Sequence, residues 1–202
     1  MAHTPSPRFI WRRVVPLIAP LALTVAACPM ISPALAAPPH RPDQSWSLAG
    51  QPGGDIPDSA VYLRYQGRVF GIEYVEGWLR TTTANGLTFH DKDSAVAVQV
   101  RPHVGGSLDA YVRTVDLPSL AHSPGFQRGA LTHDTIGGYP ALRLVYRGRS
   151  APDDVTGKTT PVQADRYYVA GRRALAIITL STPTGVDNVD GFRRIAHSFR
   201  FR

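Results

Sequence analysis

Apolar and polar residues alternate along several short segments, and this period of two predicts β-strands with one buried face. We expect strands at residues 69–75, 87–90, 95–101, 141–147, 164–170 and 173–181. In the last of these, Leu175 and Ile177 face one way while Ile178 and Leu180 face the other. A strand that is apolar on both faces is expected in the middle of a sheet, with a layer packed on each side.

Two other segments repeat their apolar residues with the period of a helix. The first follows Ser107, a favoured N-cap residue, and is expected to end at Pro118. The second is expected over residues 187–199. Turn residues such as Gly171 and Arg172 join neighbouring strands as hairpins. The order of elements therefore predicts an α+β fold with a mainly antiparallel sheet.

The first 36 residues have the features of an export signal rather than of a folded domain. Arg8, Arg12 and Arg13 precede an apolar run over residues 14–27, and no acidic residue occurs before Asp43. Fourteen apolar residues are too few to span a bilayer, which needs about 20. A basic start followed by a short apolar run is typical of a secretory signal peptide.

Two cleavage sites compete at the end of this leader. Cys28, the only cysteine of the chain, follows Val25-Ala26-Ala27 as in a bacterial lipobox, so residues 1–27 would be removed and Cys28 would carry a lipid. Alternatively, Ala34-Leu35-Ala36 before Ala37 is a site for ordinary signal peptidase, and residues 1–36 would be removed. We therefore expect either a secreted or periplasmic protein or one anchored on the outer side of the cytoplasmic membrane.

A proline- and glycine-rich stretch separates the leader from the expected domain. Residues 37–57 show no apolar period, so we interpret them as a disordered linker. Residues 58–202 then form one domain of ordinary size, which we expect to be monomeric.

The net charge of +7 suggests nucleic-acid binding until the leader is removed. Loss of Arg8, Arg12 and Arg13 leaves 19 of the 22 basic residues against 15 acidic ones, a net charge of +4. No run of five like charges occurs. We therefore expect no nucleic-acid partner, and membrane contact only through a lipid anchor or at the periphery.

Four short motifs, in this order, resemble the PsbP-like and LpqN-like domains, which share a Mog/PsbP-type fold. They are the aromatic opening at residues 70–78, the helix start at residues 107–111, Gly138-Tyr139-Pro140-Ala141, and the ending at residues 192–200. Val75-Glu76 departs from the usual Tyr-Pro of the first motif. The resemblance implies an α/β/α sandwich with helices on both faces of an antiparallel sheet, in an exported, often lipid-anchored and non-catalytic protein.

The residue types that carry catalysis or bind metals form no convincing set. The chain has no G-x-S-x-G motif, and Cys28 lies in the leader. His90-Asp91 and His133-Asp134 are adjacent pairs, whose side chains point to opposite faces of a strand. Glu73 and Glu76, the only glutamates, lie in the opening motif. We expect no catalytic residue, no metal and no cofactor.

The remaining functional signal is the distribution of arginines. We expect Arg143, Arg147 and Arg149 to share a strand face, with Arg166, Arg172 and Arg173 nearby if their strands pair. Such a surface suits an envelope protein or another anionic surface, whereas the simpler interpretation is an ordinary solvated face.

These observations favour an exported, non-catalytic accessory or binding domain at the cell envelope. A carrier of a small apolar ligand, held between sheet and helix, is the alternative, and a small hydrolase is a third. An aromatic-lined cavity would favour the carrier and a filled core the interaction module.

Overall fold

The structure, a computed structural model, describes residues 54–83, 86–102, 105–153 and 156–202. Cys28, Ala36 and Ala37 lie outside these residues, so the leader and its cleavage sites remain predictions. Residues 54–57, at the end of the expected linker, contact the domain: the Ile56 amide donates to the side chain of Asn188 at 2.7 Å.

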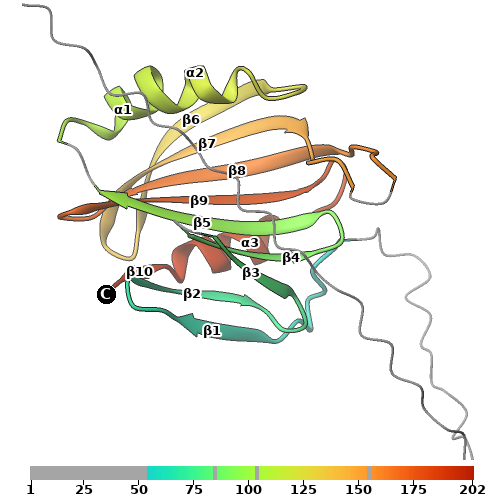
Figure 1. The fold of residues 1–202 in the computed structure, drawn as a ribbon. Helices are drawn as coiled ribbons and strands as arrows, with labels where there is room; N and C mark the ends of the chain where they lie inside the picture. The colour runs from blue at the N-terminus through green and yellow to red at the C-terminus, as the bar shows by residue number, and fades with distance from the viewer. Residues whose placement is uncertain (1–53, 84–85, 103–104, 154–155) are drawn as a thin grey trace, which may run out of the picture. The chain divides into compact units, whose positions relative to one another are not determined.

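An antiparallel sheet of seven strands forms the frame of the domain (Figure 1). Its strands, in spatial order, are β3 (Leu79–Thr83), β4 (Gly86–Asp91), β5 (Ser94–Pro102), β9 (Ala174–Pro183), β8 (Pro161–Ala170), β7 (Tyr139–Arg149) and β6 (Gln127–Ile136). β9 lies in the middle of the sheet, and Leu175, Ile177, Ile178 and Leu180 are all buried. The prediction of a central strand with two buried faces is therefore confirmed.

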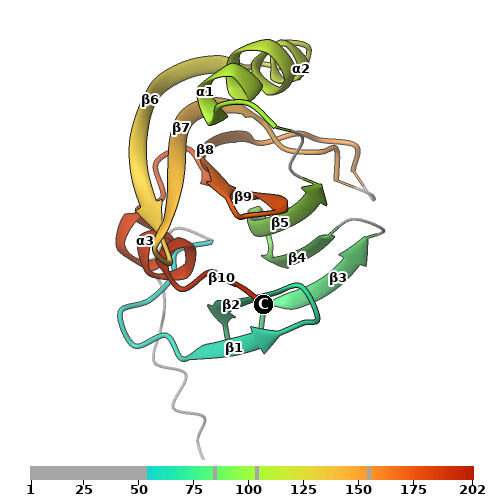
Figure 2. The same cartoon turned by 90° about the vertical axis from the view of Figure 1, so that its left-hand side faces the viewer.

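One face of this sheet contributes to a large apolar cluster. Phe89, Val96 and Ile178 from the sheet are fully buried in the same cluster as Ile195 from helix α3 (Val189–His197). A second, three-stranded sheet adds side chains to this cluster; it consists of β1 (Tyr62–Gln66), β2 (Phe70–Val75) and β10 (Arg200–Phe201). Figure 2 shows α3 and the three-stranded sheet on this side.

The other face carries a helical segment composed of α1 (Leu108–Tyr111), the π-helix η1 (Val112–Asp116) and α2 (Leu117–Leu120) (Figure 2). Val112 from this segment is fully buried with Leu144, Tyr168 and Ile177 of the sheet. The segment begins as predicted, because the Ser107 hydroxyl accepts a hydrogen bond from the Ala110 amide at 3.1 Å.

The prediction that Pro118 ends this helix is wrong, since Pro118 lies in the first turn of α2 and the helical path continues to Leu120. Proline lacks an amide proton and its ring crowds the carbonyl four residues earlier. The wider π-turn just before it, in which the Leu117 amide donates to the carbonyl of Val112, gives the chain a helical path past this residue.

The α+β class and the mainly antiparallel sheet are confirmed by these pairings. β1, β3, β6 and β10 were not predicted, because they are edge strands or very short. All five residues of β3 are exposed, so no alternation marks it in the sequence. Among the described residues, no helix is long and apolar enough to cross a membrane.

Candidate functional site

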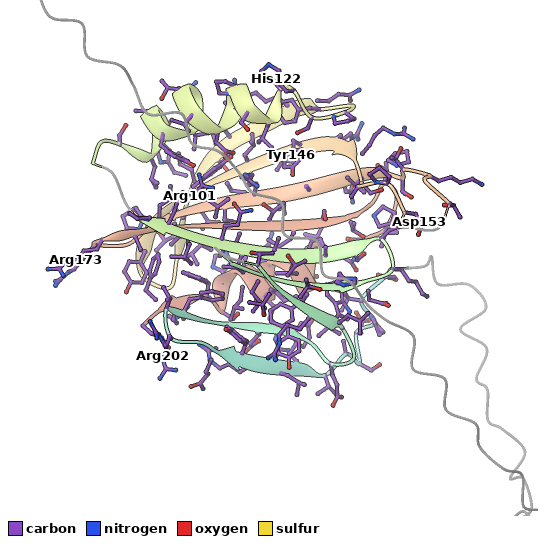
Figure 3. The ribbon with its side chains drawn as sticks, viewed as in Figure 1. Arg101, His122, Tyr146, Asp153, Arg173 and Arg202 are labelled. Atoms are coloured by element: carbon purple, nitrogen blue, oxygen red, sulfur yellow. The ribbon has the colours of Figure 1, made fainter. Side chains whose placement is uncertain are left out.

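A polar groove of about 610 Å³ lies on the helical face of the seven-stranded sheet. One wall comes from the end of the helical segment and the loop after it, with Leu120, Ser123 and Phe126. The opposite wall is the turn between β4 and β5, with His90 and Lys92. Tyr146 of β7 and residues 148–153 line the remaining side, and Figure 3 shows Tyr146 below the helical segment.

The groove exists because side chains on this sheet face change from large to small along β9. Leu175 and Ile177 are large and lie under the helical segment. The next residues on the same face, Thr179 and Ser181, are short and line the groove, as does Ala95 opposite Ser181 on β5. The helical segment therefore covers one half of the face and leaves the other half open.

A buried carboxylate–arginine pair is joined to this groove through the lining residue Thr179. Arg166 of β8 donates from Nε and Nη2 to the two carboxylate oxygens of Asp116, at 2.9 and 3.0 Å. The Tyr168 hydroxyl donates to the same carboxylate at 2.6 Å. Arg166 Nη1 donates to the hydroxyl of the groove residue Thr179 at 2.6 Å. The side chains of Arg166 and Asp116 are only 13% and 8% exposed, so the pair is largely shielded from solvent.

Burial and this pairing shift the protonation equilibria of the cluster. Burial disfavours the charged form of Arg166, but its hydrogen bonds and Coulomb attraction to Asp116 outweigh that effect, and the pKa of Arg166 is raised. Burial, followed by the hydrogen bond to Asp116, raises the pKa of Tyr168 far above its usual range. Burial also raises the pKa of Tyr146, although the charge of Arg166 opposes this. Both tyrosines therefore stay neutral at physiological pH.

The arrangement suits binding better than catalysis. Asp116 accepts three short hydrogen bonds, so it is occupied and poorly placed to act as a general base. Within the part of the chain that the structure describes, no three His, Cys, Asp or Glu side chains gather to hold a metal ion. The groove instead offers hydroxyls, the aromatic rings of Phe126 and Tyr146, and charges of both signs, from Lys92 and Arg149 and from Asp93 and Asp153.

The structure does not bring the five predicted partner-binding arginines to one surface. β7 and β8 do pair, but Arg143 and Arg166 lie on opposite faces, because Arg143 is opposite Tyr167 while Arg166 is opposite Leu144. Arg143 is half-buried and donates to Asp165 at 2.7 Å. Arg166 is on the other face, where it forms a buried ion pair with Asp116. The expected shared surface therefore does not include Arg166.

The other three arginines of the set are exposed. Arg147 and Arg149 are opposite Gln163 and Pro161, so their register positions lie on the same strand face as Arg143, as expected. Arg149 lines the groove and donates to Thr159 at 2.6 Å. Arg172 lies in the β8–β9 turn, at the opposite end of these strands. Their role in partner binding remains a prediction.

Asp116 and the groove were missed by sequence reasoning. Nothing local distinguishes Asp116, since its partner Arg166 is 50 residues away. The available signal was an acidic residue within the apolar stripe of a helix that contains proline, a combination that is unfavourable unless the carboxylate is paired. Two of the candidate acids that were set aside are half-buried and lie beside basic side chains: Glu73 pairs with Arg194 at 2.9 Å, and Asp134 approaches His197 at 3.7 Å.

Comparison with known proteins identifies the fold. No protein-family model matches the sequence, and no curated protein matches it significantly. Among solved structures, the cyanobacterial PsbP protein CyanoP of Synechocystis is 18% identical, over 76% of this chain and 98% of its own, with a TM-score of 0.50.

Two further solved structures match more weakly. The Ran-binding protein Mog1p of Saccharomyces cerevisiae is 10% identical over 70% of this chain and 94% of its own, with a TM-score of 0.48. LpqN of Mycobacterium tuberculosis, a protein involved in cell envelope biogenesis, is 14% identical over 70% of this chain and 90% of its own, with a TM-score of 0.46. The similarity to CyanoP shows that the chain has a PsbP-like fold.

Proposed function

We propose that this chain is an exported, non-catalytic accessory or binding domain that acts at the cell envelope, and that the polar groove is its binding site. The basic and apolar leader supports export. The sequence motifs shared with PsbP-like and LpqN-like domains support the non-catalytic class and the α/β/α sandwich. A fold alone does not assign a function, so the proposal depends on the groove.

The groove carries this proposal because it combines recognition groups without a reactive centre. Lys92 and Arg149 supply positive charge, Asp93 and Asp153 supply negative charge, and the rings of Phe126 and Tyr146 supply flat apolar surface over a floor of short hydroxyl side chains. Binding sites are typically apolar hollows with a few placed polar groups. A polar segment of an envelope partner that carries charges of both signs fits this chemistry.

The packing of the two apolar clusters favours an interaction module over the alternative of an apolar carrier. Side chains between the sheet and the helices, such as Val112, Tyr168 and Ile195, are fully buried. A carrier would need an apolar cavity of several hundred Å³ in this space. The hollow beside Phe192 of α3 measures about 160 Å³, and a hollow of about 380 Å³ beside Tyr111 of the helical segment is the space that a carrier would have to use. The hydrolase alternative would need a nucleophile beside a free base, and the groove's one buried carboxylate neighbour, Asp116, is occupied by Arg166 and Tyr168.

Site-specific photocrosslinking in the cells that produce the chain tests this function. A benzophenone amino acid at Phe126 keeps an aromatic ring in the groove wall, next to Tyr146 at a ring-centroid distance of 5.5 Å. The matched control carries the same probe at Val61, which is 54% exposed next to strand β1 and lies outside the groove. We expect a discrete crosslinked product from position 126 and not from position 61.

The same cells also test export. We expect the mature chain to begin at Ala37 or at a diacylated Cys28, measured as the mass of its N-terminal peptide. Equal products from both probe positions would contradict a binding role for the groove, and an intact leader on all of the chain would contradict export.

A further inference from the structure

A second surface, at the opposite end of the strands from the β4–β5 turn, gathers arginines that have no acidic partner. Three parts of the chain meet there: the β1–β2 turn, the β8–β9 turn and the C-terminus. The Arg202 amide donates to the carbonyl of Val69 at 3.0 Å, which joins the C-terminus to the first turn. Figure 3 shows Arg173 and Arg202 at this end.

These parts enclose a hollow of about 490 Å³, which we call the cationic end. It is lined by Val69, Tyr139, Gly171, Arg172, Arg173, Ala174, Phe201 and Arg202. No acidic residue is among them. Arg68, exposed beside Val69, adds a further positive charge to the same turn.

The arginines of the cationic end differ from those elsewhere in the domain. Arg143, Arg166 and Arg194 each pair with a carboxylate at 2.7–2.9 Å. Within the described residues, no acidic side chain lies within 4 Å of Arg172, Arg173 or Arg202, and all three are exposed. The α-carboxylate of Arg202 offsets one positive charge, and the remaining arginine charge is concentrated here without acidic side-chain partners.

Apolar side chains line the same hollow as these arginines. Val69 is 47% exposed. The half-buried rings of Tyr139 and Phe201 pack edge to face at 5.0 Å and form a floor between the arginines. Gly171 brings the β8–β9 turn against this floor, since a Cβ there would lie 2.8 Å from the Phe201 ring.

Exposed arginines around an aliphatic and aromatic floor suit the interface of a membrane. Arginine side chains lie along apolar surface while their charged heads reach phosphate groups, and aromatic rings favour the headgroup level. An acidic protein would neutralise the charges as well. It would not account as directly for the aliphatic side chain of Val69, which is left in solvent beside them.

We propose that the cationic end docks on an anionic lipid bilayer. β8 and β9 are ten residues long, and at about 3.3 Å per residue they separate the cationic end from the far end of the groove by roughly 30 Å. Asp153, which lines the groove, lies at the other end of the molecule from Arg173 in Figure 3. Docking would therefore leave that end of the groove facing away from the bilayer. The inference goes beyond the proposed function and can fail separately, because its test changes no groove residue.

Vesicle sedimentation with the full chain tests this docking. The vesicles contain phosphatidylglycerol and phosphatidylcholine in equal parts, or phosphatidylcholine alone. The test variant is Arg172→Gln/Arg173→Gln/Arg202→Gln. The control, Arg128→Gln/Arg147→Gln/Arg193→Gln, removes the same charge from exposed positions elsewhere.

We expect the test variant to lose affinity for the anionic vesicles on the order of 100-fold, since each arginine near such a surface contributes about fivefold. The affinity of the control variant for the same vesicles should change by less than about threefold. Val69→Gln should also weaken binding, without affecting the melting temperature.

Equal losses in the two triple variants would overturn the proposal, because they would reflect net charge alone. Unchanged binding of the test variant would overturn it too, by assigning the interaction to the leader that all variants share. The proposal would also be overturned if the wild-type chain did not bind the anionic vesicles. Binding of polyglutamate as tight as binding of the vesicles would assign the surface to an acidic protein partner instead.

Discussion

Removal of the Asp116 carboxylate is the substitution that should destabilise this domain most clearly. In Asp116→Ala, Arg166 keeps its charge but loses both hydrogen bonds that neutralise it, at 2.9 and 3.0 Å. The Tyr168 hydroxyl loses its acceptor in the same step. Arg166 is only 13% exposed, so little water is available to replace the carboxylate.

The expected cost follows from this burial. Breaking a buried ion pair by removing one partner typically costs about 3–5 kcal/mol, because the other charge stays buried without compensation. In a domain of this size, we expect a fall in melting temperature on the order of 10 °C. Replacement of both partners, in Asp116→Ala/Arg166→Met, should recover at least half of the loss, since no unpaired charge remains.

Thermal and urea unfolding, followed by circular dichroism, measure these differences. Asp109→Ala is the matched control: it removes a carboxylate of the same helical segment, 3.8 Å from Arg113, in a pair that is 41% and 58% exposed. That change should cost less than about 0.5–1 kcal/mol. If Asp116→Ala costs no more than Asp109→Ala, or if the double variant is less stable than Asp116→Ala, the account of the buried pair is refuted.

Two further predictions concern other buried polar groups. The raised pKa of Tyr168 means that the folded state keeps this proton while the unfolded state releases it near pH 10, so the stability it contributes is present below about pH 10 and lost as the pH rises. Tyr168→Phe should cost about 1–2 kcal/mol at neutral pH and flatten this alkaline loss, as measured by urea midpoints across pH; an unchanged alkaline slope would count against it. Asn188 accepts from Ile56 at 2.7 Å and donates to Gly54 and Thr182 at 2.8 and 3.0 Å. Asn188→Ala should cost about 2–4 kcal/mol in the same assay, since it leaves buried groups unpaired, whereas a cost below that of the exposed change Asp190→Ala would show that these bonds contribute little.

The parts of the fold that were predictable are those whose burial depends on local pattern. β9 was predicted as a central strand because Leu175 and Ile178 face opposite ways, and it is central. The second helix was predicted over residues 187–199 and is present as Val189–His197, with Phe192 and Ile195 buried. In both cases, the pattern of apolar residues within one segment is sufficient to predict the element.

The missed elements lack such a signal. β6 is mostly exposed and its register shifts between Arg128 and Leu131, so the alternation of its residues is interrupted. Local rules predict that a helix ends at Pro118, because proline lacks an amide proton and crowds the preceding turn. The π-turn that allows the helix to continue through Pro118 forms in the folded segment, and no residue pattern in the sequence marks it.

The candidate site was harder to predict because it depends on residues distant in sequence. Arg166 was grouped with surface arginines, but the register of β7 and β8, in which Arg166 is opposite Leu144, places it on the other face from Arg143. Its partner Asp116 comes from a separate helical segment, and no local pattern predicts that contact. The groove depends on how far the helical segment extends across the sheet, which no local pattern of residues determines.

The central claim, that the groove binds an envelope partner, is tested most directly by filling it. Ala95 lines the groove floor, and Ala95→Trp should occupy that space without changing the buried pair. Val61→Trp is the control, at a 54% exposed position outside both the groove and the cationic end. With the photocrosslinking probe at Phe126, we predict that the crosslinked product disappears in Ala95→Trp and persists in Val61→Trp. A product of equal yield in the two variants would contradict the claim.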